Sequence, residues 1–222
     1  MEEMNQGIQY MQEGKYQEAA QCFNDAIESS PNDPVGYINF GNLLVHINDF
    51  DRAIRFFQKA IALDETAATA YYGLGNLYFE KEDYAKAQRY YQKAVHYGLE
   101  EADVFFMLGL SFQQEKNDKL ALPYFLRAKE IQPDDEIILF QYGLSLAQSE
   151  QLTLAKETFE QVLEINPSHS DAHYNLAVAF LFEENSEKAL YHLNEAIRLQ
   201  PDHTLALSLK EQVETLLQQN EE

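Results

Sequence analysis

Hydrophobic residues in this chain fall on helical faces that are interrupted by short polar breaks. In the first half, Tyr71, Leu74, Gly75 and Tyr78 stand at positions i, i+3, i+4 and i+7, which form one face of an α-helix. After the polar break at residues 81–83, a second apolar face with helical spacing begins. The pattern therefore predicts two helices joined by a tight turn, with their apolar faces packed together.

This pair of segments returns every 34 residues along the chain, without insertion or deletion. Such a period indicates an array of helix pairs, in which each pair buries its apolar face against its neighbours. Small residues at fixed positions would let two helices approach, and bulky residues would fill the remaining space. The alanine positions are Ala19, Ala53, Ala87, Ala121, Ala155 and Ala189; the glycine positions are Gly7, Gly41, Gly75, Gly109 and Gly143, followed by Ala177; the bulky positions are Phe23, Phe57, Tyr91, Phe125, Phe159 and Leu193.

The glycines of the stretch YGLGN, residues 72–76, pose a separate question, because two glycines two apart can also begin a phosphate-binding loop. That loop needs a preceding strand and a third glycine three residues later, and this place is taken by Tyr78. We therefore interpret Gly73 and Gly75 as residues within a helix, and Gly75 as a packing position.

The repeating unit has an aromatic-x-x-Leu-Gly-x-x-Tyr first helix and an Ala…Phe…Ala…Pro second half, and it resembles the tetratricopeptide repeat (TPR). The stretches YINFGNLL, AATAYYGLGNLY and KLALPYFLRA are similar to those of the small TPR-only proteins of Gram-positive bacteria. The resemblance covers essentially the whole chain. It implies an all-α fold, a right-handed superhelical α-solenoid of six helix-turn-helix units with a C-terminal capping helix.

We expect a single TPR array over residues 1–222, because the period runs through the chain without a break. Pro123 falls about a turn inside a second helix, where it should bend that helix or delay its start. The predicted repeats are 1–33, 34–67, 68–101, 102–135, 136–169 and 170–203, and the capping helix is 204–219, with an apolar stripe of Leu205, Leu209, Val213 and Leu216.

The charge of the chain restricts the partners that it is expected to bind. Its 222 residues include 16 Lys and Arg against 37 Asp and Glu, which gives a formal net charge of −21. Nucleic acid and anionic membranes bind through clustered cations, so we expect neither as a partner. A basic protein segment would instead be attracted, and salt would weaken that attraction.

Several features favour a cytoplasmic location. Cys22 is the only cysteine, so no intrachain disulfide can form, as is usual in a reducing compartment. The N-terminal stretch MEEMNQGIQY has neither the basic region nor the apolar run of a secretory signal. No stretch approaches the roughly 18 apolar residues of a membrane-spanning helix.

The residues that could carry chemistry do not form a catalytic or metal-binding pattern. Cys22 lies on a second helix without a histidine near it in sequence, and we interpret it as a packing residue. His169 and His173 have a spacing that can hold a metal on a helix. However, His169 falls in the turn before the helix, and His173 takes an aromatic packing position. We therefore expect that the protein has no enzymatic activity and binds neither a metal nor a cofactor.

What remains is a surface on the first helix of each repeat, beside the packing positions. There the resemblance to TPR arrays implies a concave groove that binds extended or helical peptides of a partner. A ladder of aromatic and apolar residues could bury apolar anchors of the partner, and the asparagines could hydrogen-bond its backbone. The candidate groove residues, called here the ladder, are Ile38, Asn42, Val45, Tyr72, Asn76, Phe79, Phe106, Leu110, Phe140, Leu144, Tyr174 and Val178.

Acidic C-terminal tails of the kind that chaperones carry are poor partners for this ladder. TPR domains that clamp such tails use Lys and Arg together with Asn, whereas here Ile38 and Tyr72 stand at the Lys positions. A groove without cations leaves a buried carboxylate uncompensated. The expected partner is therefore a protein or peptide with a neutral-to-basic segment and apolar anchors.

The main interpretation is a protein-protein interaction scaffold or adaptor. Beside it stand a packing origin of the ladder and three other functions: a receptor for short signalling peptides, a self-associating structural protein, and an enzyme with an unrecognised site. An average TPR also carries an aromatic residue and an Asn at these places, so the ladder can partly reflect packing between neighbouring first helices. The groove can serve as a receptor for short signalling peptides. A terminal repeat can also stack on a second copy, which would make the chain a self-associating structural protein.

Overall fold

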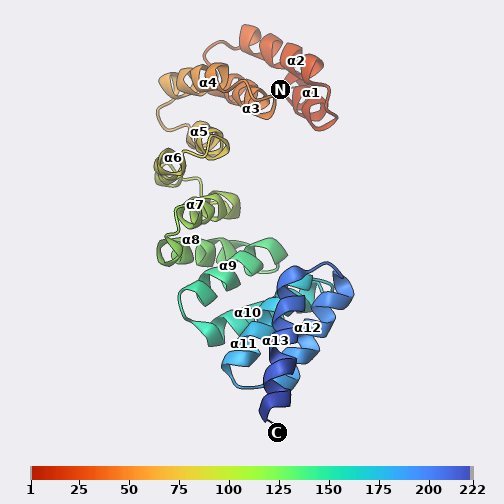
Figure 1. The fold of residues 1–222 in the computed structure, drawn as a ribbon. Coiled ribbons are helices and arrows are strands. Elements are labelled where there is room, and N and C mark those ends of the chain that lie inside the picture. The colour runs from red at the N-terminus through yellow and green to blue at the C-terminus, as the bar shows by residue number, and fades with distance from the viewer. Residues whose placement is uncertain (1, 221–222) are drawn as a thin grey trace. The chain divides into compact units, whose positions relative to one another are not determined.

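The computed structural model describes residues 2–220, and this part of the chain contains thirteen α-helices and no strand (Figure 1). The all-α class expected from the sequence is therefore confirmed. Helices of this length are marginal alone in water, so packing against neighbours holds them. The helices are α1 (Glu2–Gln12), α2 (Tyr16–Ser29), α3 (Pro34–His46), α4 (Phe50–Leu63), α5 (Ala68–Glu80), α6 (Tyr84–His96), α7 (Ala102–Gln114), α8 (Asp118–Ile131), α9 (Glu136–Gln148), α10 (Leu152–Ile165), α11 (Ser170–Phe182), α12 (Ser186–Leu199) and α13 (Thr204–Asn220).

The helices form two compact units, of which unit 1 ends at Lys116 and unit 2 begins at Asn117. Unit 1 holds α1 to α7, and unit 2 holds α8 to α13. Within each unit, a helix packs mainly against the helices before and after it in the chain. The boundary divides the predicted repeat 102–135, and a single array over the whole chain stays a prediction.

The helix boundaries and the buried positions follow the 34-residue period of the sequence. α3 begins at Pro34 and α5 at Ala68, the first residues of the predicted second and third repeats, and the later first helices keep this spacing. The alanine and bulky positions form the core, because each of these side chains is at most 1% exposed. Burial of one large apolar side chain per repeat is a main source of stability.

Gly75 is a packing glycine, as expected from its place in the period. A Cβ atom added there would lie 2.4 Å from the ring of Tyr91, which is far inside van der Waals contact. The same approach of glycine and ring recurs in the first, second and fifth repeats. In the sixth repeat the corresponding pair is Ala177 and Leu193, both buried. A smaller side chain at the bulky position therefore goes with a methyl group at the glycine position.

The turn inside each repeat contains a left-handed residue that the sequence did not signal. In the second repeat, Asn48 has a φ of 60°, and its N–H bonds the Val45 carbonyl at 2.9 Å. The next N–H, of Asp49, bonds the Leu44 carbonyl at 2.8 Å. These two bonds form a Schellman motif, which satisfies carbonyls at the helix end. The six left-handed positions are Gly14, Asn48, Glu82, Lys116, Glu150 and Glu184, with φ between 57° and 73°.

Helix α8 corrects one alternative left by the sequence. It begins at Asp118 and contains Pro123, so the proline does not delay the start of the helix. Pro123 has no N–H, and the helix therefore lacks the hydrogen bond from this position to the carbonyl four residues earlier.

Helix α13 packs on α12 as the predicted capping helix, and Leu209 and Val213 of the expected stripe contact the core of unit 2. Ala206 is fully buried and Val213 is 5% exposed, whereas Leu205 and Leu216 are 59% and 60% exposed. The prediction that Leu205 and Leu216 belong to the packing stripe is therefore wrong. The reason is that Ala206, as a small residue, permits the close approach to α12 that sets the orientation of the helix.

Candidate functional site

The ladder side chains are neither core nor fully exposed, apart from Ile38. Ile38 is only 6% exposed and belongs to the core of unit 1. The other eleven ladder side chains are partly buried. This intermediate burial is what a surface needs if its residues are to be held rigidly and still contact a partner.

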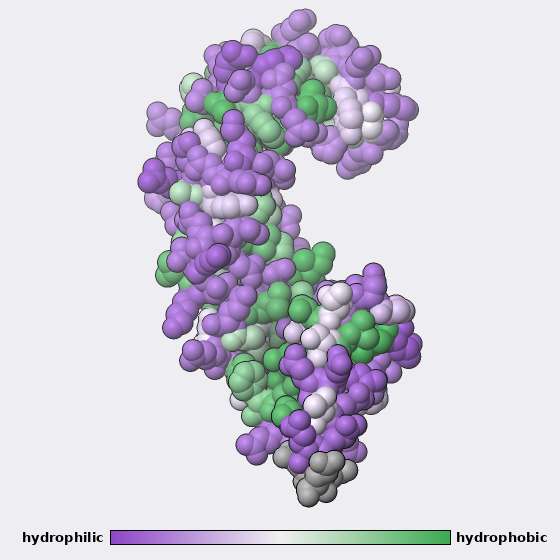
Figure 2. Space-filling view, viewed as in Figure 1, coloured by the Kyte–Doolittle hydropathy of each residue, from purple (hydrophilic) through white to green (hydrophobic). Residues whose placement is uncertain are grey.

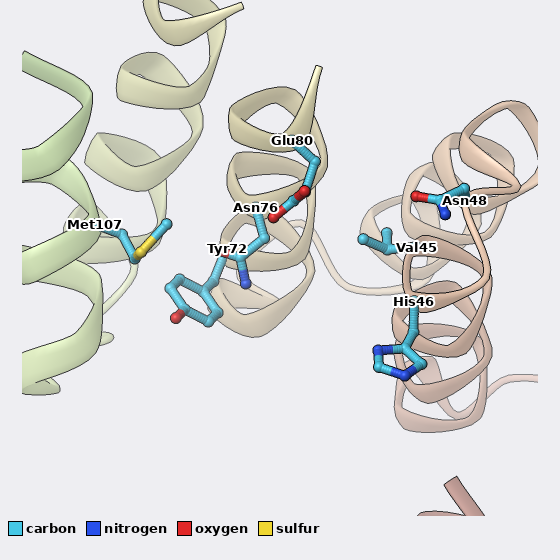
Figure 3. Close-up of a pocket in the computed structure, with 7 residues that line it drawn as sticks. All are labelled: Val45, His46, Asn48, Tyr72, Asn76, Glu80 and Met107. Carbon is cyan, nitrogen blue, oxygen red and sulfur yellow. The ribbon is translucent and has the colours of Figure 1, made fainter. Parts of the chain in front are cut away.

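In unit 1, part of the ladder lines a cavity of about 400 Å³ (Figure 3). Tyr72, Asn76 and Glu80 come from one face of α5, because they are spaced four residues apart. Met107 of α7 lies on one side of this face in the close-up, and residues of α3 lie on the other. The complete lining is Val45, His46, Asn48, Tyr72, Asn76, Glu80 and Met107.

The amide of Asn76 is oriented by a buried hydroxyl. Tyr91, which is fully buried, donates a hydrogen bond from its OH to Oδ1 of Asn76 at 2.8 Å. Because the amide oxygen is occupied, the Asn76 NH₂ group is the part of the side chain that can serve a ligand as a donor. In the other repeats the bulky position is Phe or Leu, which cannot make this bond.

The surroundings of this cavity are acidic. Burial raises the pKa of the Tyr72 hydroxyl, and the carboxylates of Asp103 and Glu101 raise it further, against a hydrogen bond with Asn76 that lowers it. Burial also raises the pKa of Tyr91, and Glu80 adds to that effect. Both tyrosines are therefore neutral hydrogen-bonding groups at physiological pH.

In unit 2, ladder residues line two grooves that are mainly apolar. One, of about 560 Å³, includes Leu144 and Leu152, and the other, of about 370 Å³, includes Tyr174 and Leu209. Val178 and Phe182 line both grooves, so the two adjoin along α11. The side chain of Phe182 is 68% exposed. An aromatic ring in this position offers a large apolar contact area to a partner.

The space-filling view agrees with this difference between the units. On the face shown in Figure 2, hydrophobic side chains gather on unit 2 over the region of α9 to α11. The visible face of unit 1 is mostly hydrophilic, with scattered hydrophobic side chains.

Several ladder residues also pack within the protein. The ring of Phe140 lies 4.5 Å from that of His169, and the ring of Tyr174 lies 5.2 Å from that of His203, centroid to centroid. His169 caps the N-terminus of α11 by accepting a hydrogen bond from the Ala172 N–H at 3.2 Å. Part of the ladder thus has the packing role that was one of the alternatives.

The structure brings together only some of the predicted site residues. Val45, Tyr72 and Asn76 line the cavity of unit 1, and Leu144, Tyr174 and Val178 line the adjoining grooves of unit 2. The remaining members do not line these cavities: Ile38, Asn42, Phe79, Phe106, Leu110 and Phe140.

Sequence reasoning missed Phe182 and Met107 as lining residues. Phe182 stands one helical turn after Val178, at the repeat position that Glu80 occupies in the third repeat. Extending the ladder by one more turn of helix would have found it. Met107 gave no such signal, because it lies beside the ladder rather than on it.

His173 contacts His192 of α12, and not His169 as a shared metal site would require. His173 is 7% exposed, and its Nε2 lies 3.3 Å from the Pro167 carbonyl, the contact that Tyr37 makes with Pro31 in the second repeat. Its Nδ1 lies 2.9 Å from Nδ1 of His192. Burial lowers the pKa of His173, and it lowers that of His192 to about 4. In residues 2–220 no group of three or more His, Cys, Asp or Glu side chains could hold a metal ion.

Comparison with models of protein families shows which family the chain belongs to. One tetratricopeptide repeat model matches residues 10–59 and 146–213, which together are more than half of the chain. A second tetratricopeptide repeat model matches residues 72–136. A TPR repeat model matches residues 41–82. The chain belongs to the tetratricopeptide repeat family. The all-α TPR solenoid expected from the sequence is therefore confirmed.

Individual relatives agree with this assignment. The TPR repeat-containing protein YrrB of Bacillus subtilis (strain 168) is 49% identical over 41 residues, which cover 18% of this chain and only 20% of that protein. The crystal structure of YrrB, described as a TPR protein with an unusual peptide-binding site, has a TM-score of 0.81 at 46% identity. That comparison covers 86% of this chain and 99% of the YrrB chain. The predicted resemblance to YrrB-like bacterial TPR proteins is thus confirmed.

More distant structures share the fold alone. A Pseudomonas aeruginosa pilF structure has a TM-score of 0.80 at 17% identity, covering 95% of this chain and 96% of its own. A MamA structure has a TM-score of 0.69 at 19% identity, covering 77% and 93%. Among the described helices of this TPR protein, none is both long and apolar enough to cross a membrane.

Proposed function

We propose that this TPR protein is a non-catalytic scaffold or adaptor that binds a segment of a partner protein along the ladder of its first helices. The observation that carries the proposal is the pair of adjoining apolar grooves on α11, with Phe182 exposed between them. A large exposed ring beside partly buried aliphatic side chains is typical of the anchor sites of protein interfaces.

Two further facts support a peptide or protein as the ligand. The relative YrrB, whose structure matches this chain at 46% identity, is described as having a peptide-binding site. The net charge of −21 favours a neutral-to-basic segment, which long-range attraction would steer toward the protein. We place this activity in the cytoplasm, because a single cysteine fits a reducing compartment.

The proposal is tested by affinity capture from a cell extract with three forms of the full chain. The forms are the intact protein, a Val178→Ser/Phe182→Ser double variant, and a Tyr191→Ser variant. Tyr191 on α12 is a matched control, because it is an aromatic residue of similar exposure, 61% against 68% for Phe182, and lines neither α11 groove. Circular dichroism first confirms equal helicity.

We expect a protein that the intact form and Tyr191→Ser retain and the double variant loses. Equal retention by all three forms would contradict binding at α11. If only short peptides are retained, the alternative of a signalling-peptide receptor is supported. If the captured protein is the chain itself, self-association is supported.

A further inference from the structure

We propose that the cavity of unit 1, between α3, α5 and α7, binds an arginine side chain of the partner segment. This inference rests on the proposed function, since it assigns a chemical preference to one part of the ladder. It goes beyond that function by naming the side chain that is recognised and the residues that recognise it.

The charge in and around the cavity calls for a cation. Glu80 lines it, and Asp103 and Glu101 act on Tyr72, which lines the same cavity. None of its seven lining residues is Lys or Arg.

The lysines near the cavity in sequence are engaged elsewhere. Lys81 places its Nζ over the Phe50 ring, 5.6 Å from the centroid, and Lys86 bonds the Asp83 carboxylate at 2.6 Å. His46, the one lining residue that can become cationic, places Nε2 2.8 Å from the Tyr16 hydroxyl. The carboxylate of Glu80 therefore has no cationic partner among the residues that line the cavity.

The shape of the lining selects a guanidinium over a simple point charge. Tyr72, Met107 and Val45 supply apolar and aromatic surface in the cavity that Glu80 also lines. A guanidinium is weakly hydrated, stacks on aromatic faces, and presents a planar pair of donors to a carboxylate. An ammonium group is more strongly hydrated and would lose more on entering such a site.

The oriented amide of Asn76 adds a contact for the backbone of the same segment. Its NH₂ group stands between Tyr72 and Glu80 on α5, and the hydrogen bond from Tyr91 fixes the amide oxygen. An NH₂ group held in this way can donate to a peptide carbonyl next to the bound arginine. The ladder of the third repeat thus supplies one acceptor for the guanidinium and one donor for the backbone.

The test is an NMR titration of the full chain with two capped tripeptides that differ only in the end group of one side chain. The probes are acetyl-Ala-Arg-Ala-amide and its citrulline counterpart, in which a neutral urea replaces the guanidinium. The signals followed are the Met107 methyl group and the Asn76 side-chain amide. We expect both signals to shift on addition of the arginine probe. The citrulline probe should bind at least about fivefold more weakly, and high salt should weaken binding of the arginine probe.

Glu80→Gln is the decisive variant, and Glu82→Gln is its control in the neighbouring turn. Glu80 is exposed, so the exchange leaves the fold intact. We expect Glu80→Gln to weaken arginine binding at least about fivefold and Glu82→Gln to leave it unchanged. Equal shifts with both probes, no shift with either, or full binding in Glu80→Gln would overturn the arginine site.

The two proposals fail in different ways. If the arginine probe does not bind but a captured partner depends on Val178 and Phe182, the scaffold function stands and the arginine site is refuted. If the probe binds as expected but no partner depends on α11, the arginine site stands and the proposed function is refuted.

Discussion

Helices α5 and α11 occupy equivalent places in the third and sixth repeats, yet they present different chemistry. Equivalent residues of the two helices lie 102 positions apart, which is three periods of 34 residues. One face is polar and acidic and lines the unit 1 cavity, and the other is apolar and lines the unit 2 grooves. The three pairs are Tyr72 with Tyr174, Asn76 with Val178, and Glu80 with Phe182.

The difference teaches that the positions that build this fold are separate from those that give it a specificity. At the packing positions both repeats carry a buried alanine, Ala87 or Ala189, and a fully buried bulky side chain, Tyr91 or Leu193. The fold therefore does not determine what the exposed face of each first helix binds.

The largest expected loss of stability tests whether the two units depend equally on a small residue at the alanine position. Ala87 in unit 1 and Ala189 in unit 2 are both 0% exposed at the same repeat position. Ala87→Glu and Ala189→Glu each place a charge in a close helix contact and should reduce the free energy of unfolding by about 3 kcal/mol or more. Glu82→Ala, in an exposed turn, should change it little. Chemical denaturation measures all three, and equal midpoints would contradict the packing account.

A smaller effect is expected where the repeats differ in the glycine contact. Gly75→Ala brings a methyl group against the Tyr91 ring and should destabilise the protein by about 1–3 kcal/mol. In a Tyr91→Leu background, which imitates the Ala177 and Leu193 pair, the same change should cost about 1 kcal/mol less. A double-mutant cycle by urea denaturation gives this coupling, and additive costs would show that the ring is not the obstacle.

We also expect the stability of the two units to depend differently on pH. Unit 1 stacks Tyr78 on Tyr90, and unit 2 stacks Phe180 on His192 at the equivalent positions. Burial and the adjacent His173 lower the pKa of His192 to about 4, with Lys188 acting in the same direction and Glu195 opposing it.

The sign of the pH effect follows from this lowered pKa. The unfolded histidine takes up a proton below about pH 6.5 and the folded one only near pH 4, so stability is full above pH 6.5 and falls toward pH 4. His192→Tyr should reduce this loss by on the order of 1 kcal/mol. Thermal melts at pH 7.5 and 5 measure the difference. An identical loss in both proteins would show that His192 has no part in it.

The smallest effect concerns the left-handed turns. Glu82 has a φ of 57°, a conformation that glycine adopts without strain, whereas the first repeat already has Gly14 there. Glu82→Gly should raise the free energy of unfolding by about 0.5 kcal/mol, because relief of strain exceeds the added freedom of the unfolded chain. Gly14→Glu should lower it by a similar amount. If Glu82→Gly lowers the free energy of unfolding and Gly14→Glu raises it, side-chain contacts of the turn residues outweigh their φ preference.

The sequence was sufficient for the fold because the fold depends on side-chain size at fixed spacing. Helical periodicity, the alanine positions and Gly75 are local patterns, and six copies in register reinforce each of them. The left-handed turns escaped prediction because Glu and Lys disfavour this conformation, and packing of the flanking helices overrides their preference.

The candidate site was only partly predictable from the sequence. Repetition placed the ladder, but the orientation of Asn76 depends on a hydroxyl that lies fifteen residues away and is buried. Likewise, one groove is lined by Phe182 of α11 together with Leu209 of α13, and no local pattern of the sequence indicates that these two side chains meet.

The most direct test of the account is a binding titration with the partner recovered by capture. It compares the intact protein, Tyr191→Ser, and a Val178→Asn/Phe182→Glu variant, in which α11 carries the residues that α5 has at the equivalent positions, Asn76 and Glu80. We predict unchanged affinity for Tyr191→Ser and at least about tenfold weaker binding for the exchanged helix face, with equal helicity in all three. Equal affinity for the three proteins would contradict the claim that the ladder of the first helices binds the partner.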